Sequence, residues 1–442
     1  MKHNSFFLLG MLLFISLCAS ANADWKKQSE NPEYLHRSIK EVTDVIVHDI
    51  YSPPVASRIY AYVTIAAYEA AYHSNASYIS FAGQLHGLGN LPQPDADKQY
   101  SYSLSSVNAL LLVAKSMIIS EEKLTAFQAA ILQQIKTSGM PADVFDNSVA
   151  FGKKIADHII TWALKDNYKQ TRSLSKYAVD KEAASWKPTP PSYMKAIEPH
   201  WGKLRTFLID SAQQFKPLPP TAFSIDKNSQ FYKEAKEVHD VGLNLTPEQI
   251  EIANFWDCNP FKMNINGHVM YATKKISPGG HWVNINRLAC KKSNLDFVKC
   301  AETYAWLCVT LADGFISCWD EKYRSKVIRP ETYINQYISQ SWVPLLQTPP
   351  FPEYTSGHSV VSAACAVILS KFFGNNFSYS DSTEVEFNIP VRHFNSFKQA
   401  AEEAAISRFY GGIHYMPSIV NGMQEGDKLG VYISQTLKTR KG

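Results

Sequence analysis

The sequence predicts an all-α protein, a helical bundle interrupted by a long proline-rich excursion. Apolar residues recur at three- and four-residue steps through most of the chain, as they do on one face of a helix. Segments that alternate polar and apolar residues in the manner of a strand are scarce. Hydrophobic residues make up 45% of the 442 positions and charged residues 19%, which allows a substantial buried core. We interpret residues 24–442 as one compact domain.

The first 23 residues have the features of a signal peptide that is removed on export. A basic start precedes an apolar run over residues 6–17, and Ala-Asn-Ala at 21–23 provides small residues for cleavage. The run is short for a membrane span, and nothing later in the chain is long and uncharged enough to act as one. We therefore expect a periplasmic or extracellular protein. Lipid attachment at Cys18 is a less favoured alternative, because the bulky Leu17 precedes it.

The N-terminal region, residues 35–165, is expected to be helical. Leu35, Ile39 and Val42 begin a periodic apolar face that continues to residue 50, and the prolines at 53 and 54 stop this first segment. Further helical patterns cover residues 55–73, 100–119, 121–137 and 142–165.

Residues 166–235 form the proline-rich excursion. Seven prolines lie between Pro188 and Pro220, a density that prevents long helices. The same stretch contains Trp186, Tyr193 and Trp201. Because burial of such large side chains compensates for ordering the backbone, we expect this excursion to wrap around the bundle in a fixed course.

Regular helices are expected again in the C-terminal region, residues 246–438. Thr246-Pro-Glu-Gln249 combines an N-cap threonine, a proline at the first helical position and a capping-box glutamine. Residues 277–282 are rich in glycine and proline and are expected to be a loop before a long helix over 295–323. The remaining helices are expected at Gly357–Phe373, at Phe394–Arg408 and near 426–438.

Charge and cysteine content limit the expected partners and metals. The formal net charge is +4 without long basic runs, so we expect no nucleic-acid partner. Six cysteines follow the signal peptide, and this even number permits disulfides in an oxidising compartment, with Cys290 and Cys300 as the most local pair. Cys308, Cys318 and Cys365 fall within apolar helical patterns, where buried thiols are the simpler explanation. No Cys-x-x-Cys motif or Cys/His cluster is apparent in the sequence, so no zinc site is expected.

Three short segments carry the candidate chemistry. They contribute three cations that suit a tetrahedral oxyanion, namely Lys322, Arg329 and Arg408. Ser356 offers a hydroxyl group, and Gly357 allows a backbone N–H to come close to a ligand. The sequence therefore predicts an anion-binding pocket in the C-terminal third of the chain.

A helix start and two histidines add to this pocket. Ser356-Gly357 is expected to begin a helix, whose unpaired N–H groups and positive dipole end attract the same anion. His358 and His414 can divide the labour, because one can bond to the central atom while the other moves protons. Each residue alone has an ordinary explanation, such as a solvated lysine or a core histidine. Their order and spacing together indicate a site.

The three segments resemble the tripartite signature of the type 2 phosphatidic acid phosphatase and vanadium haloperoxidase superfamily. They read Lys322 with Arg329-Pro330, then Phe-Pro-Glu-Tyr-Thr-Ser-Gly-His at 351–358, then Ser407-Arg408 with His414. The Phe-Pro-x-Tyr lead resembles the soluble bacterial vanadium haloperoxidases more than the membrane lipid phosphatases. Residues 52–62 and 201–205 also resemble that branch, so the resemblance covers most of the mature chain. Only residues 322–414 carry highly specific motifs.

The resemblance implies a bundle of the vanadium haloperoxidase and acid phosphatase type, with a role for each site residue. The three cations would neutralise the equatorial oxygens of the anion, helped by Ser356 and the N–H of Gly357. His358 would be the acid–base residue near the apical oxygen. His414 would be the axial vanadium ligand in a haloperoxidase or the nucleophile in a phosphatase. Phe351 would lie on the halide side.

Two positions depart from the family pattern. Thr355 stands where a proline usually precedes Ser-Gly-His, a mild change in the stiffness of the loop. Four residues beyond His414 the family usually has an aspartate, and here that residue is Ser418. Because a carboxylate partner orients such an imidazole and raises its basicity, full efficiency of His414 requires another acceptor.

The resemblance implies an exported haloperoxidase-like enzyme that oxidises a halide with hydrogen peroxide and uses vanadate as its cofactor. A secreted acid phosphatase that works through a phosphohistidine at His414, without a cofactor, is the runner-up, because phosphate and vanadate share charge and shape. A third possibility is a protein that binds phosphate or vanadate without turnover. The serine at 418, in place of the usual aspartate, is its main support. In each case the expected partner is a small molecule, either peroxide and halide or a phosphomonoester. A membrane lipid phosphatase fits less well, because no membrane span is expected.

Overall fold

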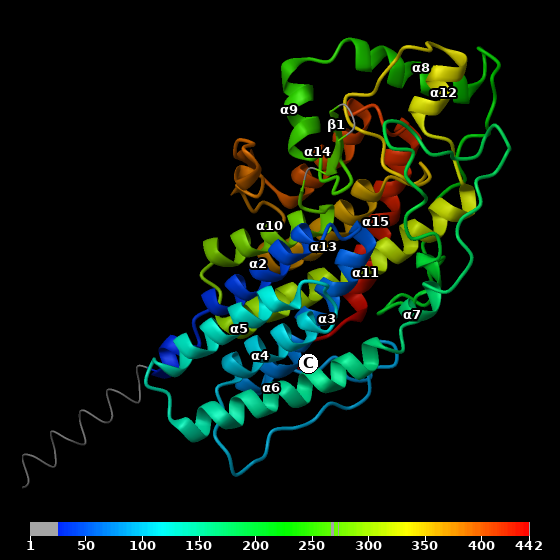
Figure 1. Ribbon diagram of the computed structural model, residues 1–442. Coiled ribbons are helices and arrows are strands. Elements are labelled where there is room, and N and C mark those ends of the chain that lie inside the picture. Colours follow the sequence, from blue (N-terminus) through cyan, green and yellow to red (C-terminus); the bar gives the residue numbers. More distant parts are fainter. Residues whose placement is uncertain (1–24, 267–268, 273, 442) are drawn as a thin grey trace, which may run out of the picture.

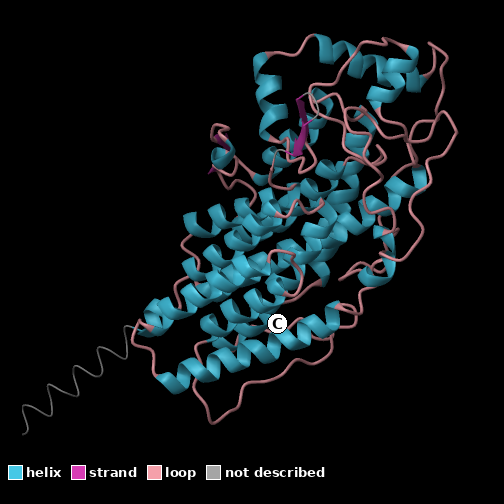
Figure 2. Ribbon diagram, in the orientation of Figure 1, coloured by secondary structure: helices cyan, strands magenta, loops and turns pink. Residues whose placement is uncertain are grey.

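The computed structural model describes residues 25–266, 269–272 and 274–441, and it is built mainly of helices (Figures 1 and 2). The all-α prediction is confirmed, since the strands of the described residues form two short antiparallel hairpins. The expected signal peptide at 1–23 and the alternative of lipid attachment at Cys18 lie outside the described residues. Within the described residues, no helix combines the length and the apolar character that crossing a membrane requires.

The N-terminal helices closely follow the predicted ones. They are α2 (Glu33–His48), α3 (Pro53–Ala71), α4 (Tyr102–Lys115), α5 (Glu121–Lys136) and α6 (Ala142–Ala163). The prolines at 53 and 54 both end the first segment and begin α3, because Ser52 caps the helix by accepting a hydrogen bond from the N–H of Val55. Every residue of α3 is buried, which explains why this helix lacks a polar face.

The proline-rich excursion follows a fixed course along the bundle, as expected. Its helical parts before residue 230 are α7 (Tyr168–Thr171) and a 3-10 turn at Trp201–Lys203. Of the three large aromatic residues expected to order this stretch, Trp186 and Trp201 are fully buried, whereas Tyr193 is 64% exposed. Asp313 anchors the excursion, because its carboxylate accepts the backbone N–H groups of residues 207–209 at 2.7–3.1 Å.

The C-terminal region contains the remaining elements. The helices are α8 (Gln230–Leu243), α9 (Pro247–Phe255), α10 (Pro278–Lys292), α11 (Phe297–Ser325), α12 (Pro330–Tyr337), α13 (Gly357–Phe373), α14 (Phe397–Tyr410) and α15 (Met416–Thr436). The hairpins pair β1 (Met263–Asn266) with β2 (Val269–Ala272) and β3 (Tyr379–Asp381) with β4 (Arg392–Phe394). The capping box predicted at Thr246 and Gln249 is confirmed.

Three expectations for this region were wrong, and each error concerns a proline. Residues 277–282 are not a loop, because Ser277 caps α10 and Pro278 occupies its first position. The short α12 was not predicted, and it begins at Pro330 directly after Arg329. The last helix begins at Met416, well before residue 426, with Pro417 in its first turn. A proline that resembles a helix breaker is tolerated in the first turn, where its missing N–H would have no acceptor in the helix.

The N- and C-terminal helices share one core. A continuous cluster of buried apolar side chains extends from Trp25 to Leu437. Helix α3 packs against α11, and α13 packs against α15; Figure 1 shows the N-terminal helices (blue to cyan) alongside the C-terminal ones. The contact between α13 and α15 requires glycine, because a Cβ at Gly426 would lie 2.1 Å from the carbonyl oxygen of Val360.

The six cysteines of the described chain are buried free thiols. Cys290 and Cys300, the most local pair, are therefore not joined by a disulfide. Cys308, Cys318 and Cys365 lie within α11 and α13, in the apolar surroundings that the sequence indicates.

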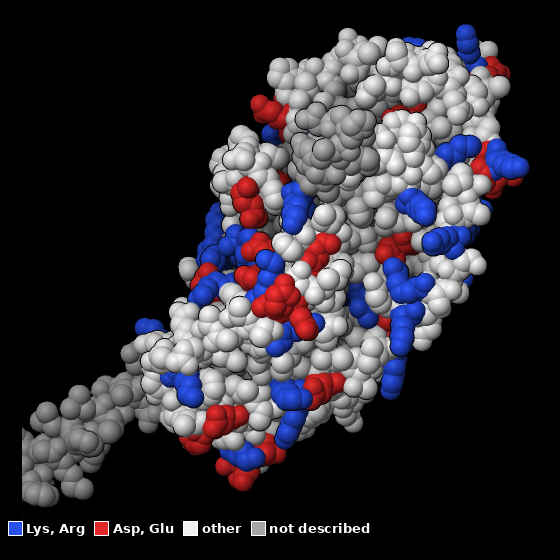
Figure 3. Space-filling model, viewed as in Figure 1, with Lys and Arg blue, Asp and Glu red and all other residues white. Residues whose placement is uncertain are grey.

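The charged side chains are mixed on the visible surface. On the face shown in Figure 3, acidic and basic groups are interspersed over the helices and do not gather into a field of one sign. Exposed ion pairs also form within single helices, such as Lys236 with Asp240 in α8. This face thus lacks the basic stripe that is typical of nucleic-acid binding.

Candidate active site

The predicted site residues converge where the C-terminal end of α11, the start of α13 and the turn between α14 and α15 meet. Five of them line one pocket: Phe351, Gly357, His358, Arg408 and His414. Lys322 and Arg329 are fully buried against the loop at residues 351–356, the motif loop, and Ser356 caps α13, which begins at the pocket. The structure therefore brings the three sequence segments together.

Lys322 organises the loop that carries Ser-Gly-His. Its Nζ donates to the carbonyl oxygens of Pro352 and Glu353 at 3.1 Å, and to that of Thr355 at 2.5 Å. Burial lowers the pKa of the ammonium to about 8. Because all three N–H donors are used by carbonyl groups, Lys322 reaches a bound anion directly only by exchanging one of these bonds.

The two arginines each present an unused donor. Arg329 donates through Nε to the carbonyl of Phe351 at 2.9 Å and through Nη1 to that of Ile413 at 2.8 Å, while its Nη2 has no partner among the described residues. Arg408 donates through Nη1 to the carbonyl of Trp256 at 2.7 Å, and its buried Nε has no partner in the described chain. Buried charged donors without acceptors are costly, so this arrangement is suited to an anion that supplies them.

The start of α13 adds backbone donors to the pocket. The hydroxyl of Ser356 accepts the N–H of Ser359 at 3.3 Å, which leaves its own proton free to donate. Gly357 is the first helical residue, and the first N–H groups of a helix have no intrahelical acceptor. A Cβ at Gly357 would make only ordinary contact with Trp319, at 3.6 Å, so packing does not demand the glycine. Its effect is to leave the helix start open to a ligand.

His414 is oriented by Glu353. Its Nδ1 lies 2.8 Å from Oε1 of Glu353 and 3.3 Å from the hydroxyl of Ser418. Its Nε2 lies 3.2 Å from Nη1 of Arg329, which can only donate. Nδ1 therefore carries the proton, and the lone pair of Nε2, which accepts from Arg329, can bind a ligand in the pocket once that contact is exchanged. Glu353 is thus the acceptor that replaces the aspartate missing at position 418.

The charge state of this pair follows from its surroundings. Burial lowers the pKa of His414 well below its ordinary value, and Arg329 and Lys322 lower it further, so the imidazole is neutral. Burial raises the pKa of Glu353 to about 7, against the opposing effect of the same two cations. Glu353 also accepts the N–H of Tyr415 at 3.1 Å, which fixes the carboxyl group in place.

The turn before His414 depends on glycine. Gly412 has a φ of +75°, which is unfavourable for residues with a side chain. A Cβ at Gly411 would lie 2.7 Å from Leu346. The two glycines thus let the chain reverse after Arg408 and bring His414 back to the pocket.

His358 faces the pocket and is partly exposed. Its Nε2 lies 3.0 Å from the carbonyl oxygen of Trp256, which also accepts from Arg408. Nε2 is therefore protonated and Nδ1 is free to accept a proton. Burial lowers the pKa of His358 well below its ordinary value, and the nearby Arg408 lowers it further. The role of Trp256 has no sequence signature, because any residue provides a carbonyl group.

Aromatic residues form the apolar wall of the pocket. The ring of Phe351 packs against Trp319 with centroids 4.9 Å apart, and the guanidinium of Arg329 lies 5.1 Å from the same ring. Phe315 and Phe261 complete this wall. Phe261 comes from the segment after α9, for which no functional role was expected.

The fold and the pocket define a class of protein, a helical bundle whose buried cations, helix start and carboxylate-oriented histidine suit a tetrahedral oxyanion. Comparison with known proteins agrees. The family model of the VCPO second helical-bundle domain matches residues 302–440. A crystal structure described as the first bacterial vanadium-dependent iodoperoxidase superposes with a TM-score of 0.88; it is 50% identical and covers 93% of this chain and 98% of that one.

Two more distant similarities are consistent with this result. A bacterial vanadium-dependent chloroperoxidase superposes with a TM-score of 0.65 at 15% identity, over 88% of this chain and 93% of that one, and it shares the fold. A vanadium-dependent bromoperoxidase of Corallina officinalis is 31% identical over 96 residues, which span 20% of this chain and 16% of that protein. The chain belongs to the vanadium haloperoxidase superfamily and is a vanadium haloperoxidase-like enzyme.

Proposed function

We propose that this enzyme is a vanadate-dependent haloperoxidase that oxidises a halide with hydrogen peroxide, and that iodide is a substrate. The observation that carries the proposal is the environment of His414. Its Nδ1 donates to Glu353 at 2.8 Å, so Nε2 is unprotonated and would bind the central atom of an oxyanion in exchange for its contact with Arg329. Similarity to the bacterial iodoperoxidase, at 50% identity, supports the choice of halide.

The buried donors fit vanadate. Nη2 of Arg329 and Nε of Arg408 have no acceptor among the described residues, and a tetrahedral oxyanion would supply one to each. The N–H of Gly357 and the hydroxyl of Ser356 would donate to the same anion from the start of α13. His414 would be the ligand to vanadium through Nε2.

The bound vanadate would supply the activation of hydrogen peroxide toward the halide. Around it, Lys322 holds the motif loop and contributes positive charge. His358 would accept and return a proton through Nδ1, because its Nε2 is committed to the carbonyl of Trp256. The division of roles between the two histidines therefore follows from their different hydrogen-bond partners.

The aromatic wall would receive the halide. Iodide is large, polarisable and weakly hydrated, so an apolar wall costs it little desolvation. Phe351 provides that wall, and the guanidinium of Arg329, 5.1 Å from the ring, provides compensating charge. We therefore keep the assignment of Phe351 to the halide side.

An acid phosphatase is the second candidate. A neutral imidazole with an unprotonated Nε2, next to two arginines with unused donors, would also suit attack on phosphorus once Arg329 turned its Nη1 from Nε2 to the phosphate. In that case no cofactor would be needed, and a phosphohistidine would form at His414. The pocket supports both reactions because the two anions have the same shape and charge.

We also propose that the protein is exported. The support is the short apolar run at residues 6–17, followed by Ala-Asn-Ala at 21–23.

One experiment compares these functions directly. The purified protein is assayed with vanadate, hydrogen peroxide and iodide for triiodide formation, and separately with a generic phosphomonoester without vanadate. Vanadate-dependent triiodide formation that His414→Ala abolishes is the expected result. Phosphatase activity alone would replace the proposal by the second candidate, and vanadate binding without either activity would indicate a binding protein.

A further inference from the structure

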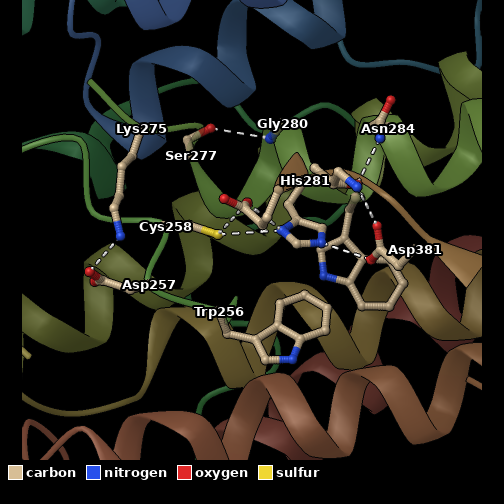
Figure 4. A network of polar contacts seen from close by, with 12 residues as sticks. Trp256, Asp257, Cys258, Lys275, Ser277, Gly280, His281, Asn284 and Asp381 are labelled. Carbon is tan, nitrogen blue, oxygen red and sulfur yellow. Dashed lines mark hydrogen bonds and ion pairs between the residues drawn. The ribbon is translucent and has the colours of Figure 1, made fainter. Parts of the chain in front are cut away.

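A second buried cluster lies behind the wall of the oxyanion pocket. It contains Cys258, from the segment after α9, His281, from the first turn of α10, and Glu384, which precedes the 3-10 turn Val385–Phe387. Their side chains are at most 2% exposed. Figure 4 shows Cys258 and His281 pointing toward each other, with Asp381 on the far side of the imidazole ring.

The three ligand atoms form a triangle of the size that a metal ion requires. Sγ of Cys258 lies 3.5 Å from Nδ1 of His281 and 3.9 Å from Oε1 of Glu384, and the last two atoms are 3.1 Å apart. Tetrahedral zinc, with bonds of about 2.0–2.3 Å, holds such atoms about 3.3–3.6 Å apart. One ion can therefore sit within bonding distance of all three with small adjustments.

The outer contacts of His281 are those of a metal-binding imidazole. Its Nε2 lies 2.8 Å from Oδ2 of Asp381, whose other oxygen accepts the N–H and the hydroxyl of Thr383 at 2.9 and 2.6 Å. The indole of Trp256 stacks on the ring with centroids 4.5 Å apart. A carboxylate that accepts from one ring nitrogen fixes a proton there, so Nδ1 is the nitrogen that faces the thiol and the second carboxylate and can bind a metal ion when its own proton is displaced.

Without a metal ion, an imidazolium at His281 can donate to Asp381 at 2.8 Å and to Glu384 at 3.1 Å, and the thiol of Cys258 has only long contacts. If Nδ1 carries a proton, that one proton faces both Glu384 and Cys258, and the thiol donates to Glu384 only across 3.9 Å. A divalent ion would satisfy the three atoms at once. Bound by a thiolate, a carboxylate and a neutral imidazole it would be electrically neutral, so it would add no net charge beside Arg408.

We propose that Cys258, His281 and Glu384 bind one zinc ion, with Asp381 as a positioning residue. Thiolate and imidazole ligands favour zinc and disfavour magnesium and calcium, which prefer oxygen. No fourth protein ligand joins these three among the residues that the structure describes, so solvent completes the tetrahedron. The expectation of no zinc site came from local spacing, and these ligands are 23 and 103 residues apart.

The zinc site would stabilise the oxyanion pocket. Cys258 lines that pocket, and the carbonyl of Trp256, two residues earlier, accepts hydrogen bonds from both His358 and Arg408. Fixing Cys258 therefore fixes the group that orients two predicted site residues. This inference does not depend on which anion the pocket holds, because it concerns different ligands.

The test measures metal directly. Untagged full-length protein is loaded with zinc, dialysed against metal-free buffer and analysed by inductively coupled plasma mass spectrometry, and a parallel sample is loaded with cobalt. We expect about one zinc per chain and, with cobalt, the absorption bands of thiolate ligation. Cys258→Ser should lose both signals, whereas Cys365→Ala, which removes a buried thiol outside the cluster, should keep both.

A second, conservative variant tests the proposal independently, in case Cys258→Ser fails to fold. Asp381→Asn keeps the shape of the side chain but removes its charge, and the zinc Kd should rise by about 10–100-fold. Wild-type protein that binds neither zinc nor cobalt would overturn the proposal. So would zinc that is retained with unchanged affinity in both Cys258→Ser and Asp381→Asn.

Discussion

Oε1 of Glu353 lies 2.8 Å from Nδ1 of His414, although the two residues are 61 positions apart in the chain. The serine at 418, where the family pattern has an aspartate, lies farther away at 3.3 Å. The carboxylate that orients the key histidine thus comes from the loop before α13 and not from the turn after His414. The orienting carboxylate is therefore retained, although it comes from a different position in the sequence than the family pattern indicates.

Glu353→Gln should lower the turnover of the proposed reaction by about 10–100-fold. The amide retains an acceptor for Nδ1 but loses the charge that raises the basicity of His414. Steady-state kinetics of triiodide formation at saturating vanadate, with circular dichroism as a check of folding, measure the effect. The double variant Glu353→Ala/Ser418→Asp should recover activity that Glu353→Ala loses.

Ser418→Asp alone should give no gain, because Glu353 already occupies the position of the acceptor. Ser418 is buried, and a second carboxylate there would face the first. If Ser418→Asp alone raised turnover while Glu353→Gln left it unchanged, Glu353 would not be the orienting group.

The sequence predicted the parts of the site that follow from local chemistry. Ser356, Gly357 and His358 are adjacent, and a helix start follows from their order, so the beginning of α13 was predicted correctly at Gly357. Glu353 was part of the same motif but received no role. The role of Glu353 depends on where the turn before His414 places that histidine, and no local sequence pattern encodes this position.

The errors in the predicted fold also arise from contacts between residues that are distant in the sequence. Gly279 and Gly280 indicated a loop, yet they lie in the first turn of α10. A Cβ at Gly280 would lie 2.7 Å from Ile276 and 2.9 Å from the hydroxyl of Tyr60, so this glycine serves close packing and not a turn. Whether a glycine provides space or flexibility depends on neighbours that are distant in sequence.

Arg408→Ala should weaken vanadate binding by about 1.5–3 kcal/mol, because it removes a charge-assisted donor in a buried pocket. Equilibrium dialysis with vanadate measures the change in Kd. Arg37→Ala is the matched control, since Arg37 is exposed and contacts Gln134. Equal affinity in Arg408→Ala and wild type would exclude Arg408 from the anion site.

The exported protein should begin at Asp24, because residues 21–23 end in the small residues that signal peptidase requires. N-terminal sequencing of protein recovered from outside the cytoplasm checks this. An N-terminus at Cys18 carrying lipid would instead establish the lipoprotein alternative.

Stability should depend on pH through Glu69, which is buried in α3 and accepts from Ser80 and from the N–H of Phe81. Burial raises the pKa of Glu69 from 4.5 to about 7. Between these values the native state binds more protons than the unfolded chain, so the free energy of unfolding falls as pH rises through this window. One group contributes at most about 1.4 kcal/mol per pH unit.

Glu69→Gln should remove this contribution. Its stability relative to wild type should therefore increase between pH 5 and pH 7 and then level off. Urea denaturation of both proteins at several pH values gives the difference and cancels other titrating groups. Parallel pH profiles would show that Glu69 is not responsible.

His358→Ala and His414→Ala should lose different properties, because the two histidines have different hydrogen-bond partners and therefore different proposed roles. In the proposed reaction His414 would bind the central atom through Nε2, so His414→Ala should lose retention of vanadate as well as turnover. His358, held by the carbonyl of Trp256, would only move protons. His358→Ala should therefore keep vanadate affinity within a few fold while turnover falls by about 10²–10⁴. Vanadate dialysis and kinetics on the same samples separate the two effects, and identical losses in both variants would refute the division of roles.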